Sequence, residues 1–110
     1  MLPKKNLLAK NLIEKVLRQG KSIRGRNISL KYLVIPGKPA AFAFIISSKV
    51  AKRAVDRNKL KRRGRAIVFK LLPQIKEGCL SLIFFEKGSI KMSFPELMAE
   101  MTQLFKKVAF

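Results

Sequence analysis

Residues 49–65 limit how this chain can fold more than any other segment, because positive charge is concentrated there. Nine of these residues are Lys or Arg, and only Asp56 opposes them. Apolar residues recur on one side of a helical projection of the region, at Leu60, Ile67, Val68 and Leu71. Pro73 then stops the helix. The pattern predicts an amphipathic helix over about residues 53–72, with one apolar and one basic side.

Helical geometry divides the polar residues of this segment into two groups. Opposite the apolar side lie Asn58, Lys59, Lys61, Arg62 and Arg65. Arg53 and Arg57 fall in line with the apolar side, so we expect the first turns to overhang the sheet. Both guanidinium groups would then point into an open groove, where cations flank a bound phosphate chain. The alternative is a charged helix face that only meets solvent.

Periodicity predicts the other elements. Apolar residues at helical spacing over residues 7–17 predict a first helix, which ends at Gly20. Period-two alternation over residues 28–35 and 40–47, around a turn at residues 36–39, predicts two strands paired as a hairpin. Residues 79–86 form a third strand and residues 93–108 a last helix, on which Ser93 and Glu96 have the form of a capping box. We expect one α+β domain over residues 1–110.

Composition narrows the function. The chain has 25 Lys and Arg against 6 acidic residues, a net charge of +19, which implies a polyanionic partner. Its longest apolar runs are far below the ~20 residues of a membrane-spanning helix, and no signal-peptide core follows the N-terminus, so we expect a cytoplasmic protein. Cys79 is the only cysteine and histidine is absent. This excludes an intrachain disulfide and a cysteine–histidine metal site, and Cys79 is expected in the core.

The six carboxylates are scattered over the expected elements, and no pair or cluster suggests a two-metal nuclease site. Ser47, Ser48 and Tyr32 are available nucleophiles, but no general base stands beside them. The sequence therefore argues against a nuclease that works by protein side chains alone.

Residues 47–65 resemble the signature of the bacterial ribonuclease P protein family. The signature joins the triplet Arg57-Asn58-Lys59, the apolar Leu60 and the pair Lys61-Arg62 on a helix that follows a strand ending in serine and lysine. The order of the elements, the length and the charge also agree. Three positions depart from the family pattern: Ser48, Lys59 and Gly64. A glycine inside a helix costs about 1 kcal/mol relative to alanine.

The resemblance implies an α+β ribonuclease P protein-like fold, with helix–strands–helix–strand–helix around one small sheet and a left-handed crossover. It implies a subunit of the endoribonuclease that removes the 5′ leader from precursor tRNA, with the catalytic RNA and precursor tRNA as partners, and neither membrane nor DNA. The chemistry would belong to the RNA and its magnesium ions, with no cofactor bound by the protein alone. The expected RNA-binding residues are Lys49, Lys52, Arg53, Arg57, Asn58, Lys59, Lys61, Arg62 and Arg65.

The family's aromatic groove positions, between the first helix and the sheet, are occupied here by Ile13 and Leu17, with Lys31 on the strand. An apolar floor and a cation could hold an extended leader by packing and phosphate contact. Leu17 could equally belong to the core. The main rival function is a ribosomal or ribosome-assembly protein that binds folded RNA, and a weaker rival is a membrane-active basic protein.

Overall fold

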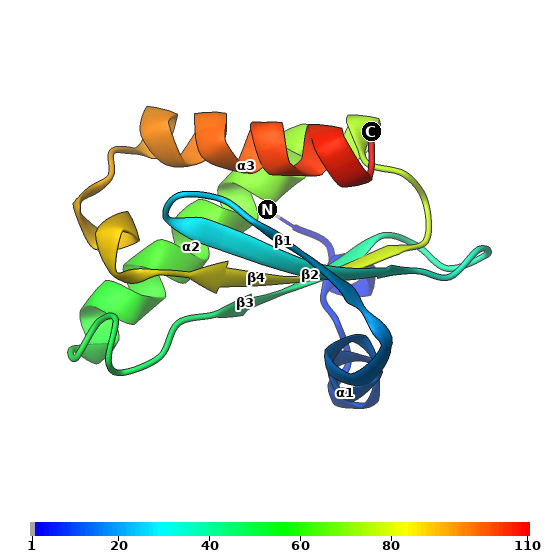
Figure 1. The fold of residues 1–110 in the computed structure, drawn as a ribbon, viewed down its shortest axis with the longest axis horizontal. Coiled ribbons are helices and arrows are strands. Elements are labelled where there is room, and N and C mark those ends of the chain that lie inside the picture. The colour runs from blue at the N-terminus through cyan, green and yellow to red at the C-terminus, as the bar shows by residue number, and fades with distance from the viewer. Residues whose placement is uncertain (1) are drawn as a thin grey trace.

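The computed structural model describes residues 2–110, which form a four-stranded sheet with helices on both faces (Figure 1). In chain order the helices and strands are α1 (Lys10–Gln19), β1 (Lys21–Arg24), β2 (Ile28–Val34), β3 (Ala41–Ile45), α2 (Ala54–Leu71), β4 (Cys79–Phe85) and α3 (Phe94–Val108). Short 3-10 turns cover Lys4–Asn6, Leu72–Gln74 and Lys87–Lys91. The α+β prediction is confirmed, and all three helices lie where periodicity predicts them.

The sheet has the order β1-β2-β4-β3. β1 and β4 each pair antiparallel with β2, whereas β3 pairs parallel with β4. The predicted hairpin of residues 28–35 and 40–47 is therefore wrong: both strands exist, but β4 lies between them. The hairpin that does form joins β1 to β2, with Lys21 opposite Tyr32.

Burial explains this order. Six of the seven residues of β4 are buried, and such a nearly continuous apolar strand belongs at the centre of a sheet. The α2 helix then acts as the crossover from β3 to its parallel neighbour β4, since parallel strands cannot be joined by a tight turn. Three of the four residues of β1 are exposed, and so short and polar a strand has no alternation to reveal it.

The two faces of the sheet are covered by different helices. Figure 1 shows α2 and α3 on one side and α1 on the other. Phe42 and Ile46 pack on the α2 and α3 side, where the ring centres of Phe42 and Phe105 lie 5.8 Å apart in an edge-to-face arrangement. Ala41 packs with Val16 on the α1 side. Alternate residues of β3 thus pack on opposite faces of the sheet.

Cys79 is fully buried, as predicted for a core residue. Its Sγ lies 3.2 Å from the Ser81 hydroxyl oxygen, and burial raises the pKa of the thiol. The predicted capping box at the start of α3 is also confirmed. The backbone N–H of Ser93 donates to Glu96 Oε1 at 2.8 Å, and the Glu96 N–H donates to Ser93 Oγ at 3.3 Å. These local contacts fix where the last helix begins.

Gly64 marks the closest approach of α2 to the sheet. A Cβ at this position would lie 2.7 and 2.9 Å from two ring carbons of Phe44 and 3.1 Å from Phe85. The cost of glycine to helix propensity is therefore offset by direct contact of the helix backbone with two aromatic rings. The absence of a side chain at Gly64 therefore lets the basic helix pack closely on the sheet.

Candidate nucleic-acid interface

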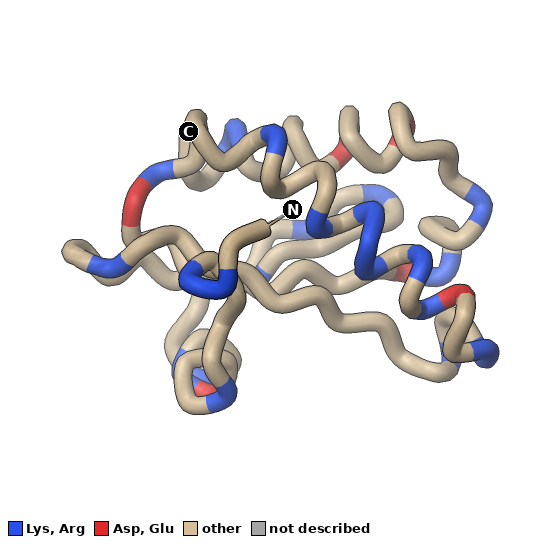
Figure 2. Tube along the Cα trace, turned by 180° about the vertical axis from the view of Figure 1, so that it is seen from behind, with Lys and Arg blue, Asp and Glu red and all other residues tan. Residues whose placement is uncertain are grey.

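The basic side of α2 is open to solvent, and at Lys61 and Arg65 it borders a hollow beside β3. Its apolar side is buried at Leu60, Ile67, Val68 and Leu71, as predicted. On the other side Asn58, Lys59, Arg62 and Arg65 are exposed, and Lys61 is half-buried. Lys49 and Lys52 are exposed in the segment before the helix. Figure 2 shows the blue positions of lysine and arginine along α2. The helix thus carries a row of cations that a polyanion can reach.

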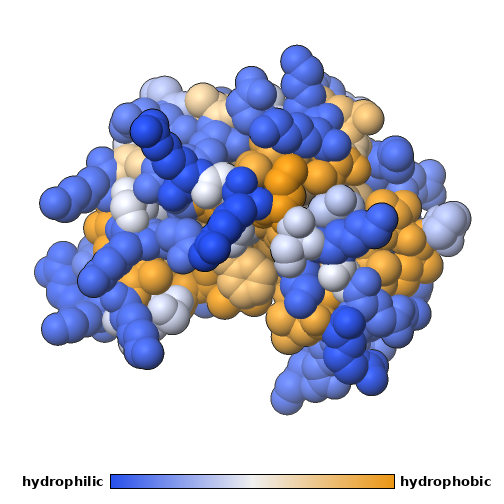
Figure 3. Space-filling view, in the orientation of Figure 1, coloured by the Kyte–Doolittle hydropathy of each residue, from blue (hydrophilic) through white to orange (hydrophobic). Residues whose placement is uncertain are grey.

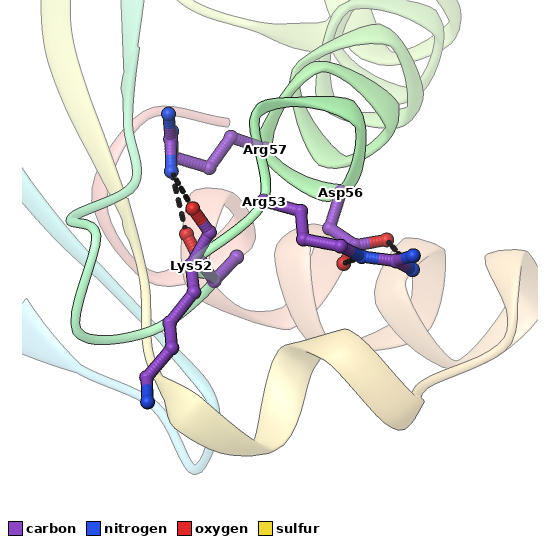
Figure 4. A network of polar contacts seen from close by, with 5 residues as sticks. Lys52, Arg53, Asp56 and Arg57 are labelled. Atoms are coloured by element: carbon purple, nitrogen blue, oxygen red, sulfur yellow. Dashed lines mark hydrogen bonds and ion pairs between the residues drawn. The ribbon is translucent and has the colours of Figure 1, made fainter.

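Arg53 stands at the N-cap of α2 and does not point into a groove. Its Nε donates to Asp56 Oδ2 at 3.0 Å and its Nη2 to Oδ1 at 3.3 Å (Figure 4). The hydrogen bond and the charge of Asp56 raise the pKa of Arg53. The side chain is 75% exposed, so the pair is a surface ion pair worth little to stability. Arg53 can still meet a phosphate, although Asp56 partly offsets its charge.

The contacts of Arg57 also differ from those expected from the sequence. Its Nη1 donates to the carbonyl oxygens of Ala51 and Lys52, both at 2.8 Å (Figure 4). The guanidinium group therefore ties the segment that precedes α2 to the first turn of the helix. Local acceptors thus engage both side chains, which differs from the expectation that Arg53 and Arg57 point freely into an open groove. A long guanidinium bonds to nearby carbonyls when the chain brings them within reach.

A groove does open on the α1 side of the sheet, with a volume of about 460 Å³. Its lining residues come from α1, β1, β2 and the end of β4: Leu17, Ser22, Ile23, Arg24, Ser29, Leu30, Lys31, Phe84 and Glu86. Leu17 is 44% exposed, which favours the groove over the core for this residue. Lys31 lies in the same groove, and Ser29 Oγ donates to Glu86 Oε1 at 3.3 Å. Leu17 and Lys31 are brought together as expected.

Ile13 is not part of this groove. It is half-buried beneath α1, against the cluster that contains Val16 and Leu82. The reason is helical spacing: Ile13 and Val16 are three residues apart and both face the sheet, whereas Leu17 lies at the edge of α1. The groove assignment of Ile13 is therefore corrected to a packing role.

Of the nine lining residues, sequence reasoning found Leu17 and Lys31 and missed seven, two of which matter most for binding RNA. Phe84 supplies a half-exposed aromatic ring, and Arg24 supplies a second cation. Strand alternation could have found Phe84, because it must face opposite to its buried neighbour Phe85. Arg24 lies on the short strand that periodicity did not reveal. The groove therefore combines an aromatic ring, three apolar side chains and two cations with the carboxylate of Glu86, which bonds to Ser29. An aromatic ring flanked by cations suits an unpaired nucleic-acid strand.

The α2 helix, which carries the row of cations, and the α1 helix, beside which the groove opens, lie on opposite faces of the sheet (Figure 1). Hydrophilic side chains project around most of the outline in Figure 3, with apolar surface between them. Among residues 2–110, no three cysteine or acidic side chains come together as metal ligands. No helix in this part of the chain is long and apolar enough to cross a membrane. The fold and these surfaces define a basic α+β nucleic-acid-binding protein.

The comparison with known proteins identifies the family. The family model described as Ribonuclease P matches residues 1–109, and the chain belongs to the ribonuclease P protein family. The ribonuclease P protein component of Microcystis aeruginosa is 38% identical over 93 residues, covering 80% of this chain and 77% of that protein. That of a Pseudanabaena species is 33% identical over 109 residues, covering 97% and 94%.

Solved structures share the fold. The ribonuclease P protein from Thermotoga maritima has a TM-score of 0.85 at 18% identity, covering 97% of this chain and all of that one. A Staphylococcus aureus ribonuclease P protein, a mutant with defective mRNA degradation activity, has a TM-score of 0.87 at 18% identity, covering 97% and 92%. Family membership makes the chain an RNA-binding component of the endoribonuclease that matures the 5′ ends of tRNA. It favours tRNA processing over the ribosomal alternative.

Proposed function

We propose that the chain uses its two surfaces for two different RNAs. The basic surface of α2, with Lys49, Lys52, Arg53, Asn58, Lys59, Lys61, Arg62 and Arg65, binds the catalytic RNA. The groove beside α1, with Leu17, Lys31, Arg24 and Phe84, binds the 5′ leader of precursor tRNA. One observation carries the proposal: the two surfaces lie on opposite faces of one sheet, so both RNAs can be bound at the same time.

The chemistry of the surfaces supports this division. On α2, exposed cations outnumber acidic groups, which suits the phosphates of a folded RNA. In the groove an apolar side chain and an aromatic ring stand beside Arg24 and Lys31. Such a groove holds an extended strand by stacking and by phosphate contact, without reading its sequence. Arg57 contributes indirectly, since it holds the segment that carries Lys52.

The protein's part in the reaction is electrostatic and positional. Two polyanions repel each other, and cations on both faces lower that repulsion while the leader is held in place. The described acidic side chains provide no gathered ligand set, so magnesium ions in the holoenzyme are proposed to be bound by the RNA. We place this work in the cytoplasm.

A cleavage assay tests the proposal. A transcribed bacterial ribonuclease P RNA is given leader-bearing precursor tRNA at low salt, with and without the purified protein. We expect the protein to stimulate cleavage and to tighten binding of precursor over mature tRNA. Protein freed of RNA should not cleave. Absence of stimulation, or equal affinity for the two tRNAs, would contradict the proposal.

A further inference from the structure

Phe69 is an aromatic residue on the side of α2 where a polar residue is expected. The buried side of the helix contains Leu60, Gly64 and Ile67, whereas Phe69 follows Arg62 and Ala66 at helical spacing on the outer side. Its side chain is 45% exposed. A single exposed apolar residue is common on protein surfaces and needs no explanation. The residues around Phe69 decide whether its exposed ring forms part of a binding site.

Those surroundings form a hollow of about 370 Å³, lined by Leu2, Arg62, Arg65, Ala66, Phe69 and Lys70. The volume is far above the ~30 Å³ that a water molecule takes in the liquid, so a planar ring can enter. Leu2 and Phe69 give the hollow apolar walls, and three cations surround it. None of the six lining residues is acidic. The hollow therefore suits a ligand that is apolar on its faces and negatively charged at its edge.

The three cations are not equivalent. The Nζ atom of Lys70 lies over the Phe94 ring, 5.5 Å from its centre, so this ammonium is drawn toward α3. Arg62 and Arg65 have exposed side chains and remain on the outer side. They continue the row of cations along α2 toward Lys59. A chain of phosphates that follows this row passes directly beside Phe69.

We propose that Phe69 is a stacking platform for one unpaired nucleotide of the catalytic RNA, with Arg62 and Arg65 binding the adjoining phosphates. The inference rests on the proposed binding of this RNA by α2. It assigns to that surface a contact that charge alone does not supply. Aromatic rings hold unpaired bases because every base has an apolar face, and flanking arginines add phosphate contacts. The hollow lies on the α2 side of the sheet, whereas the leader is proposed to bind on the α1 side. The nucleotide in the hollow therefore belongs to the catalytic RNA and not to the leader.

Fluorescence provides a direct test, because the chain contains no tryptophan. Phe69→Trp places the only indole at the platform. We expect its emission to change when a transcribed bacterial ribonuclease P RNA binds, and its affinity for the RNA to match that of the parent. Val34→Trp places an indole on β2, at a site that is 39% exposed and belongs to neither proposed RNA surface. Its emission should change little. Equal responses of the two variants would overturn the proposal.

Affinity provides the second test. Phe69→Ala should bind the RNA about ten-fold more weakly, as expected for loss of one base–aromatic stack. Phe69→Leu keeps an apolar side chain beside Leu2 and should show most of the same loss. Val34→Ala, on β2, should stay within about two-fold of the parent, as a surface substitution does. Melting temperatures of all variants must match, to exclude unfolding.

Two outcomes would overturn the proposal. In the first, Phe69→Ala keeps parental affinity for the RNA; if it then loses binding to vesicles of equimolar phosphatidylcholine and phosphatidylglycerol, Phe69 is a membrane contact. In the second, Phe69→Ala loses affinity but Phe69→Leu keeps it, which would indicate packing rather than stacking. If the parent protein itself fails to bind the RNA, the proposed function fails as well. The two failures are therefore distinguishable.

Discussion

The helices α1 and α2, which lie on opposite faces of the sheet, are held in different ways. α2 buries four large apolar side chains and places Gly64 against Phe44, whereas α1 has Val16 as its only fully buried residue. At about 1.5–3 kcal/mol for each fully buried side chain, burial stabilises α2 more than α1, on which Leu12 and Ile13 are half-buried. A helix crowded with cations needs that anchor, because its charges repel one another. Because α1 buries fewer side chains, Leu17 remains exposed at its edge and lines the groove.

The largest effect should come from cations of the strongly anchored helix. Replacing Lys59 and Arg62 by alanine removes two candidate phosphate contacts without touching the core. We expect binding of the catalytic RNA to weaken on the order of 50-fold at 0.1 M salt, and the salt slope to fall by about 2.

Binding titrations over a range of salt concentrations measure both quantities. Lys5→Ala with Lys38→Ala is the matched control, since it removes two exposed cations away from α2. If the control double variant loses as much affinity, net charge rather than the α2 surface carries the binding.

Glu100 tests how the groove wall is supported. Its carboxylate accepts from the backbone N–H groups of Asn27 and Ile28, at 2.7 and 2.6 Å, and so holds the turn between β1 and β2. We expect Glu100→Ala to lower the free energy of unfolding by about 2 kcal/mol, because two backbone donors lose a charged partner.

Chemical denaturation measures this loss. Glu77→Ala, which removes an exposed carboxylate, should change stability by less than about 0.5 kcal/mol. Equal stability of the parent and Glu100→Ala would show that the turn does not depend on α3.

The groove itself should respond more weakly. Leu17→Ser with Lys31→Ala removes one apolar contact and one cation, so we expect the preference for precursor over mature tRNA to fall about five-fold. Binding of the catalytic RNA should be retained. Both tRNAs are titrated against the assembled enzyme, and circular dichroism checks the fold. A folded variant that still discriminates like the parent would remove the groove from the leader site.

The smallest effect concerns the capping box, which belongs to neither RNA surface. Hydrogen bonds from Ser93 lower the pKa of Glu96 in the folded state. Its stabilisation is therefore fully present above the ordinary glutamate pKa of about 4.3 and disappears as the pH falls through the lower folded value. The difference in melting temperature between the parent and Glu96→Gln should shrink as the pH falls from 7 toward 3. Glu14→Gln serves as the exposed control, and a difference that does not vary with pH would contradict this assignment.

Local sequence patterns predicted the helices because helices are made of local contacts. The buried side of α2, the end of that helix at Leu71 and the Ser93 capping box all depend on residues a few positions apart. The order of the strands depends on contacts that are distant in the chain. Nothing within residues 28–47 indicates that β4 enters between β2 and β3.

In the candidate site, too, local features could be predicted from the sequence and contacts between distant segments could not. The exposed cations of α2 follow from helical spacing, and the pairing of Leu17 with Lys31 was expected from the family resemblance. The contacts of Arg57 required the path of the preceding segment, which no periodicity describes. Phe84 lines a groove only because the ten residues of α1 are too few to cover the sheet to its edge.

The crossover position of α2 limits how the chain can change in length. α2 joins β3 to β4, which are neighbours in the sheet, so its two sides must stay in phase from end to end. One inserted residue inside the helix would turn all later side chains by about 100°, carrying apolar residues into solvent and cations against Phe44 and Phe85. The turn at residues 36–39 has no such constraint, since Gly37 meets open space there. Insertions and deletions should therefore be accepted at that turn and rejected within the basic helix.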